Sequence, residues 1–178
     1  DLHAHFRQPG ALASEEVATG ARAAAHGGFG TVCAMPNTEP AADSAAVLRE
    51  SVTPADGVRS VVRILPIGAA TRGRRGAEVA PISELVRAGA VAVSDDGNPI
   101  ADPEVMRRVL VAAGAAGIPL VEHCEDSGRS AGGEAADGLV ATRLGLPAWP
   151  ADAEVAAVAR SIEALRAALG DESAARLH

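Results

Sequence analysis

Apolar and polar positions follow a pattern that repeats along the chain. In each copy an alanine-rich helical stretch ends at glycine, a short β-prone apolar run follows, and a polar cluster closes the unit. The predicted helices cover residues 15–26, 82–88, 103–116 and 153–169. The predicted strands cover residues 29–35, 90–93 and 118–121, and a further β-prone run covers 58–67. The repeat predicts successive strand–helix units rather than separate domains.

The order of these units predicts a parallel sheet. Strands that alternate with helices of this length read as short continuous apolar runs, because both faces of the sheet are covered. Each polar cluster follows the carboxyl end of a strand, where an α/β barrel or an open doubly wound sheet holds its active site. We count about five to six βα units, against the eight of a complete barrel. The pattern therefore predicts an α/β fold and a partial barrel over residues 1–178.

Composition narrows the class of protein. With 178 residues, 48% hydrophobic and 22% charged, the chain has the length and composition of one folded domain. No apolar run approaches the ~18 residues of a membrane span and the start is not signal-like, so we expect a cytoplasmic protein without membrane contact. The net charge of −7 is dispersed and only 2% of residues are aromatic, which argues against nucleic-acid binding. A small polar substrate fits better.

Two residue types limit the available chemistry. Cys33 and Cys124, the only cysteines, each lie in or beside an apolar run, so we predict buried, reduced thiols rather than a disulfide framework. All 16 basic residues are arginines. No lysine of this chain can therefore act as a general base, form a Schiff base or bridge two metals as a carboxylated side chain.

The sharpest local signal is the segment that contains His3 and His5. In a strand, side chains two residues apart share a face, so both imidazoles would lie within reach of one metal ion. Two histidines near a terminus can also carry no function. Arg7 favours the metal hypothesis, because it is expected to project to the same side, where its fork of donors would suit an anionic substrate.

Acidic and histidine residues follow two later strands. Asp95 and Asp96 form either an ordinary acidic turn or a carboxylate bridge between two metals. His123 is either a hydrogen-bonded core histidine or a further metal ligand. Because these residues and the two N-terminal histidines follow successive strands, we expect them to converge at one rim of the sheet.

Other polar and aromatic residues have more ordinary interpretations. Asn37 either binds a substrate carboxylate or makes an Asx-turn. Glu125 and Asp126 either orient a metal ligand or are plain loop charges. His26, at a helix end, is interpreted as structural. Trp149, between two prolines, is interpreted as a packed loop anchor rather than a binding platform.

Four motifs together resemble the dihydroorotase family. Asp-Leu-His-Ala-His-Phe-Arg-Gln-Pro-Gly at residues 1–10 resembles the signature Asp-x-His-x-His-x-Arg-x-Pro-Gly. Met-Pro-Asn-Thr at 35–38, Ser-Asp-Asp-Gly at 94–97 and Glu-His-Cys-Glu-Asp at 122–126 are similar to three further family motifs, in the same order. The likeness is greatest to the long bacterial (type I) enzymes of the amidohydrolase superfamily. Gln8 stands where glutamate is common, at a position to which we assign no role.

The resemblance implies a TIM barrel of the metal-dependent hydrolase type. The implied reaction is the reversible interconversion of dihydroorotate and N-carbamoyl-L-aspartate in pyrimidine biosynthesis, at a site with two zinc ions. The implied site residues are His3 and His5 on one zinc, His123 on the other, Asp96 bridging the two, and Arg7 and Asn37 on the substrate carboxylate. The implied partners are a small-molecule substrate and either a homo-oligomer or a complex with aspartate transcarbamoylase.

The resemblance also implies that parts of the catalytic domain lie outside the chain. His178 resembles the first histidine of a motif whose zinc ligand comes about three residues later, and the catalytic acid/base, an aspartate, comes later still. The family's small β-domain precedes the first strand. We therefore expect a partial catalytic domain with no acid/base of its own. It should show weak or partial zinc binding and no measurable hydrolysis by residues 1–178 alone.

Two alternatives remain open. One is an allantoinase or hydantoinase acting on another cyclic ureide. These relatives bridge their metals with a carboxylated lysine, which this chain lacks. The other is a non-catalytic dihydroorotase-like subunit that scaffolds aspartate transcarbamoylase. Such homologues tend to lose metal histidines, whereas His3, His5 and His123 are all present.

Overall fold

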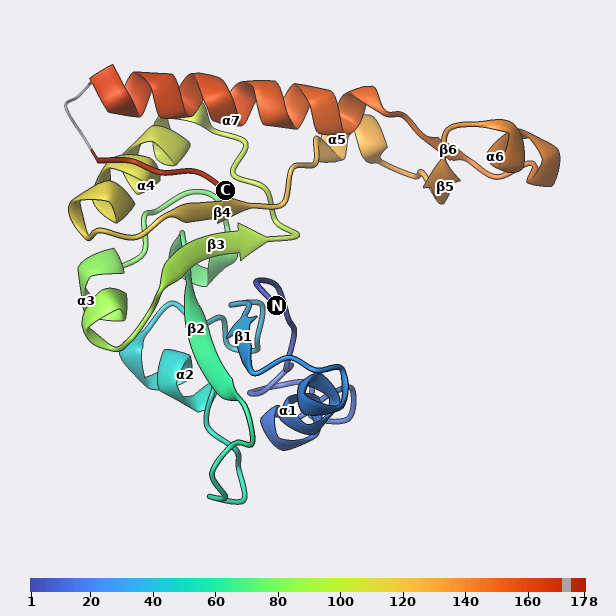
Figure 1. Ribbon diagram of the computed structural model, residues 1–178. Helices are drawn as coiled ribbons and strands as arrows, with labels where there is room; N and C mark the ends of the chain where they lie inside the picture. Colours follow the sequence, from blue (N-terminus) through green and yellow to red (C-terminus); the bar gives the residue numbers. More distant parts are fainter. Residues whose placement is uncertain (171–173) are drawn as a thin grey trace.

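Parallel strands in chain order form the centre of the molecule. The computed structural model describes residues 1–170 and 174–178 (Figure 1). Its four-stranded parallel sheet has the order β1-β2-β3-β4, with the strands β1 Thr31–Ala34, β2 Arg63–Ala69, β3 Ala92–Asp96 and β4 Leu120–Glu122. Ala4 forms a parallel bridge to Ala34, and Leu177 forms one to Leu120. Six chain segments thus run parallel in sequence order, which is the order of a partial (β/α) barrel.

Helices connect the strands and lie on the outside of the curved sheet. Figure 1 shows α2 (Ala45–Glu50), α3 (Ile82–Arg87) and α4 (Pro103–Ala115) along one side. Two further helices are α1 (Val17–His26) and α7 (Asp152–Gly170). The predicted helices 15–26, 82–88, 103–116 and 153–169 therefore all form, with ends that shift by at most two residues. The short α2 was not predicted.

The start of α4 shows how local sequence fixes an element boundary. The Asp102 carboxylate accepts hydrogen bonds from the backbone N–H of Glu104 (2.8 Å) and of Val105 (3.3 Å). These N–H groups have no partner within the helix, and Pro103 at the first helical position has no N–H to satisfy. The cap and the proline together begin the helix at the predicted residue.

The largest core cluster lies between the sheet and α4. Val93 and Leu120 of the sheet pack with Met106, Val109 and Leu110 of α4, and all five side chains are fully or almost fully buried. Removing such a side chain from water stabilises the fold by about 1.5–3 kcal/mol. This packing holds β3 and β4 in place, and the predicted site residues Asp96 and His123 lie at or just beyond the carboxyl ends of these strands.

Most predicted strand boundaries lie within two residues of those in the structure, but two were wrong by three residues or more. The third strand was expected to end at Val93, but β3 continues to Asp96, and its pairing with β4 shifts in register between those two residues. A shift of this kind bends a strand and redirects its side chains. The run 58–67 was expected to be β-prone throughout, whereas β2 begins only at Arg63 because residues 58–62 do not pair with a neighbouring strand.

A short arm lies outside the barrel and was not predicted. β5 (Ala135–Ala136) pairs with β6 (Ala148–Trp149), α6 (Leu139–Leu144) lies between them, and α5 (Ser127–Ser130) precedes them. Figure 1 shows this arm extending away from the sheet. Trp149 is 38% exposed. Its interpretation as a packed loop anchor was wrong, because it pairs in β6 and leaves part of its ring uncovered.

The remaining structural expectations have mixed outcomes. His26 lies exposed in the last turn of α1. Cys33 and Cys124 are both free thiols, but only Cys33 is buried, because Cys124 lies past the end of β4. Burial raises the pKa of both thiols. Among the described residues, no helix is long and apolar enough to cross a membrane.

Candidate metal centre

The N-terminal segment lies extended beside β1. The N–H of Ala4 donates to the carbonyl oxygen of Cys33 (2.9 Å), and the N–H of Met35 donates to the carbonyl oxygen of Ala4 (2.9 Å). His3 and His5 flank Ala4 and therefore point to the same face, as the spacing predicts. Their ring centroids are 5.0 Å apart, with an interplanar angle of 67°.

Asp96 completes a close group with the two histidines. The Nε2 atoms of His3 and His5 are 3.2 Å apart. Asp96 Oδ1 lies 3.1 Å from His3 Nε2, and Asp96 Oδ2 lies 3.9 Å from His5 Nε2. One ligand atom from each of the three residues lies within 4.8 Å of the other two. The Asp96 side chain is 6% exposed, against 43% and 28% for the two imidazoles.

Asn37, which follows β1, links two members of this group. Its Nδ2 donates to Asp96 Oδ2 (2.6 Å), and its Oδ1 lies 2.8 Å from His5 Nδ1. Since an ionised carboxylate only accepts hydrogen bonds, the amide nitrogen must face Asp96 and the amide oxygen must face His5. His5 Nδ1 therefore carries the proton, which leaves a lone pair on Nε2 inside the group.

The donor set fits a divalent cation. Two imidazole nitrogens and a carboxylate direct lone pairs at one small region, and the hydrogen bond from Asn37 presets one imidazole as a ligand. The three side chains are also close together, since Asp96 Oδ1 and His5 Nε2 lie 3.1 and 3.2 Å from His3 Nε2. Nitrogen and oxygen ligands in this ratio suit zinc and neighbouring transition metals more than magnesium or calcium.

His123 lies apart from this close group. It follows β4, is 45% exposed, and its Nε2 lies 3.3 Å from Glu125 Oε2. Ser130 Oγ donates to the other oxygen of Glu125 (2.5 Å), which fixes that carboxylate. Within the described part of the chain, the ligand atoms close enough to share an ion come from His3, His5 and Asp96. His123 and His3 nevertheless line one open cleft of about 580 Å³, together with Glu122, Cys124, Glu125, Trp149, Glu154 and Val158.

Comparisons with known proteins show the family of this chain. A family model described as "Dihydro-orotase-like" matches residues 1–171. The chain belongs to the dihydroorotase-like family. A dihydroorotase of Pelotomaculum thermopropionicum is 47% identical over all 178 residues, and one of Solibacter usitatus is 44% identical over 162 residues. The chain spans 40% and 37% of these two relatives. The resemblance drawn from the four motifs is thus confirmed.

A solved structure confirms the fold. L-hydantoinase (dihydropyrimidinase) from Arthrobacter aurescens superposes with a TM-score of 0.69 at 19% identity, covering 99% of this chain and 40% of that one. At this identity the likeness speaks for the fold alone. The partial α/β barrel predicted from the repeat is therefore correct, and His3, His5 and Asp96 lie at the rim formed by the carboxyl ends of its strands.

The two adjacent acids of the family motif have different surroundings. The fully buried Asp95 carboxylate accepts from the backbone N–H of Ala70 (3.0 Å) and of Thr71 (2.9 Å), and from the Thr71 hydroxyl. Burial raises the pKa of Asp95, and the hydrogen bonds from Thr71 oppose that rise. Asp95 thus fastens β3 to the end of β2, while Asp96 faces the histidines. The acidic-turn hypothesis was wrong, because both residues lie in β3 and are buried. The metal-ligand hypothesis stays a prediction for Asp96.

Arg7 and Gln8 differ from their sequence interpretations. The extended segment ends before Arg7, whose φ is 52°, so strand alternation does not place its side chain. Gln8 was assigned no role, but this was wrong. Its buried amide donates to the carbonyl oxygens of Thr53 (2.7 Å) and Glu50 (3.3 Å), and its oxygen accepts from Val17 N–H (3.3 Å). It fastens the N-terminal segment to α1 and α2.

Glu122 is a site-facing residue that sequence reasoning missed. Burial, together with the negative charge of Asp95, raises its pKa to about 7, and the positive charge of Arg160 opposes this rise. It lines the cleft that contains His3 and His123. Its position at the end of an apolar strand was the available signal.

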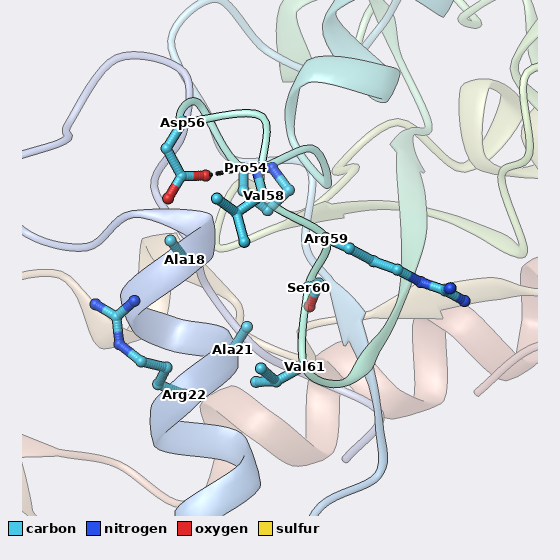
Figure 2. A pocket seen from close by; sticks show the side chains of 9 residues that line it. All are labelled: Ala18, Ala21, Arg22, Pro54, Asp56, Val58, Arg59, Ser60 and Val61. Atoms are coloured by element: carbon cyan, nitrogen blue, oxygen red, sulfur yellow. Dashed lines mark hydrogen bonds between the residues drawn. The ribbon is translucent and has the colours of Figure 1, made fainter.

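A second cavity lies beside α1. It has a volume of about 80 Å³, and α1 and residues 54–61 enclose it, as Figure 2 shows. Arg22, Asp56 and Arg59 are its charged lining residues, and Asp56 accepts a hydrogen bond from Val58 N–H (2.9 Å). None of the predicted site residues lines it.

Proposed function

We propose that the protein is a dihydroorotase, which interconverts dihydroorotate and N-carbamoyl-L-aspartate, and that residues 1–178 form part of its catalytic barrel domain. The observation that carries this proposal is the cluster of His3, His5 and Asp96, held together by Asn37, in a chain 47% identical along its whole length to a dihydroorotase. Because the chain spans about 40% of that relative, activity of the whole protein is part of the proposal.

The proposed metal is zinc. His3, His5 and Asp96 would hold one ion, and His123, on the same cleft, would contribute to a second ion that Asp96 shares. When bound, zinc polarises a substrate carbonyl and lowers the pKa of water toward ~7. Asn37 keeps the tautomer of His5 correct for this set, and Glu125 orients His123.

The substrate carboxylate would bind to Arg7, beside the metal centre. Arg7 lies close enough to Arg74 for their positive charges to interact, and Arg74 lies close to Asp96. The positive charge of Arg74 therefore adds to that of Arg7 in attracting an anion toward the metal centre, without itself contacting the anion. The assignment of Asn37 to the substrate carboxylate stays a prediction, since its amide already bonds His5 and Asp96. The acid/base aspartate expected beyond residue 178 also stays a prediction.

A hydantoinase-type reaction is the second candidate. The A. aurescens structure shares the fold, but its likeness at 19% identity does not extend to chemistry. The carboxylate in this cluster comes from Asp96, and the chain contains no lysine to carboxylate. Both features favour the dihydroorotase. The presence of His3, His5 and His123 also weighs against a non-catalytic subunit.

The test uses a protein of the relatives' length that contains this chain. Purified with zinc, it should release N-carbamoyl-L-aspartate from dihydroorotate and leave hydantoin and allantoin largely unreacted. His3→Ala should abolish turnover, whereas His26→Ala, a matched change on the exposed end of α1, should leave it unaltered. Preference for hydantoin or allantoin, or full activity of His3→Ala, would overturn the proposal.

A further inference from the structure

Three residues other than glycine have left-handed backbone conformations. Within the described residues they are Arg7 (φ 52°), Arg74 (φ 56°) and Asp96 (φ 48°). Side chains with a Cβ disfavour this conformation, so the surrounding structure must hold it in place. Burial lowers the pKa of Arg74, the charge of Asp96 raises it, and that of Arg7 lowers it. Residues from three distant parts of the sequence thus meet beside the proposed metal centre.

The guanidinium of Arg74 donates two hydrogen bonds to a backbone carbonyl oxygen next to the proposed metal ligand Asp96. Its Nε and Nη2 atoms donate to the carbonyl oxygen of Asp95, at 3.0 and 2.8 Å. Two donors of a rigid planar fork on one acceptor fix both the position and the direction of that carbonyl. The oxygen belongs to the peptide group that joins Asp95 to Asp96.

The other edge of the same peptide group is also fixed. The N–H of Asp96 donates to Ser94 Oγ (2.8 Å), and the N–H of Asn98 donates to the Asp95 carbonyl oxygen (3.2 Å). With this plane held at both edges, the φ rotation of Asp96 directs its side chain. At 48° the carboxylate lies 3.1 Å from His3 Nε2.

The segment that presents Arg74 is itself tied to β3. Arg74 lies in the short 3-10 helix η1 (Arg72–Arg74), and the Arg74 N–H donates to the Thr71 carbonyl oxygen (3.0 Å). Asn98 Nδ2 donates to the Arg74 carbonyl oxygen (3.0 Å), and Thr71 holds the Asp95 carboxylate. The bonds run in both directions between η1 and the end of β3, so they can maintain two left-handed residues at once.

We propose that Arg74 is a positioning residue for Asp96: by holding the Asp95–Asp96 peptide group, it keeps the Asp96 carboxylate directed at His3 and His5. The inference rests on the proposed metal centre and adds to it a group that touches neither metal nor substrate. Arg74 acts through the backbone, so lysine, which keeps the charge but loses the planar fork, should replace it only in part.

Cobalt titration of the 178-residue chain tests the inference. Arg74→Leu should weaken Co²⁺ binding by about 10- to 100-fold and change the intensity of the visible d–d absorption at saturation, because partners of metal ligands have effects of this size. Arg74→Lys should retain more of the wild-type Co²⁺ affinity and absorption intensity than Arg74→Leu does. Arg75→Leu removes the same charge from the exposed neighbouring residue and should behave like wild type.

A readout without metal separates this inference from the metal centre. In the metal-free chain, hydrogen exchange of the Asp96 amide should speed up about 10-fold or more in Arg74→Leu, and amides in α4 should keep their rates. Wild-type affinity, spectrum and exchange in Arg74→Leu would overturn the inference. If that variant unfolds, the same comparison is made with Arg74→Lys. A wild-type chain that takes up no Co²⁺ would refute the metal centre, and amide exchange would still decide whether Arg74 holds the peptide.

Discussion

The two histidine regions at the sheet rim differ in how they are held. His3 and His5 lie beside β1. His3 contacts Asp96 of β3 directly and Asn37 links His5 to Asp96, so hydrogen bonds and close contacts span three segments of the fold. His123 follows β4, is 45% exposed and interacts with Glu125, two residues away. A ligand held from several directions loses less freedom when a metal binds. We therefore expect the cluster to dominate metal affinity and His123 to add less.

Asp96→Asn should have the largest effect on this contrast. The amide keeps the size of the side chain but removes the anionic ligand, so zinc affinity should fall by about 100-fold or more. The same exchange at Asp137, an exposed acid between β5 and α6, should leave affinity unchanged. Competition with a chromophoric chelator measures both. Tight binding by Asp96→Asn would remove Asp96 from the ligand set.

Asn37→Ala should have the second largest effect on zinc affinity. It leaves His5 Nδ1 and Asp96 Oδ2 without their shared partner, so zinc affinity should fall about 10- to 100-fold although no ligand is lost. The free energy of unfolding of the metal-free chain should fall by only about 1 kcal/mol. Chelator competition and urea unfolding give the two values. A loss of stability without a loss of affinity would show that Asn37 is a structural residue only.

His123→Ala tests whether His123 contributes less to metal affinity than the cluster of His3, His5 and Asp96. Because His123 lies outside the close group, we expect the first equivalent of zinc to bind within a few-fold of wild type and any second equivalent to be lost. His3→Ala should instead weaken the first equivalent. Isothermal titration distinguishes these patterns. If His123→Ala weakened the first equivalent as much as His3→Ala, the proposed ranking of the two regions would be wrong.

Glu122→Gln should have the smallest effect, confined to the pH dependence of stability. Burial raises the pKa of Glu122 from 4.5 to about 7, so the folded chain binds this proton more tightly than the unfolded chain. The contribution of Glu122 to stability should therefore be fully present below pH 4.5 and be lost as pH rises through about 7, by at most about 3 kcal/mol.

Urea unfolding of the metal-free chain at pH 5 and pH 8 measures that fall. The Gln variant should lose part of it, and Glu84→Gln, on the exposed surface of α3, should retain all of it. An identical pH dependence in wild type and Glu122→Gln would show that Glu122 ionises without cost in the folded chain.

The fold was largely predictable from the sequence because it repeats. Each predicted helix combines an apolar face with a glycine or an N-cap, as Asp102 shows for α4, and such local signals act without knowledge of the rest of the chain. The six-residue α2 and the arm around α6 were missed. Both are short, and tertiary contacts decide whether so short a helix forms.

The residue types of the site were predictable from the sequence, but the separate roles of Asp95, Asp96 and Asn37 were not. The spacing of His3 and His5 fixes their common face, and that follows from strand geometry alone. Which of Asp95 and Asp96 faces the histidines depends on a left-handed φ and on a hydrogen bond from Arg74, neither of which has a local pattern. The same holds for Asn37, whose partners lie 32 and 59 residues away in sequence.

The central claim is that His3, His5 and Asp96 bind one metal ion. Anomalous diffraction at the zinc absorption edge, from crystals of the zinc-loaded chain, tests it most directly. We predict a strong peak about 2.0–2.2 Å from His3 Nε2, His5 Nε2 and an oxygen of Asp96. A peak bonded to other residues, or no peak near these three side chains at saturating zinc, would contradict the account.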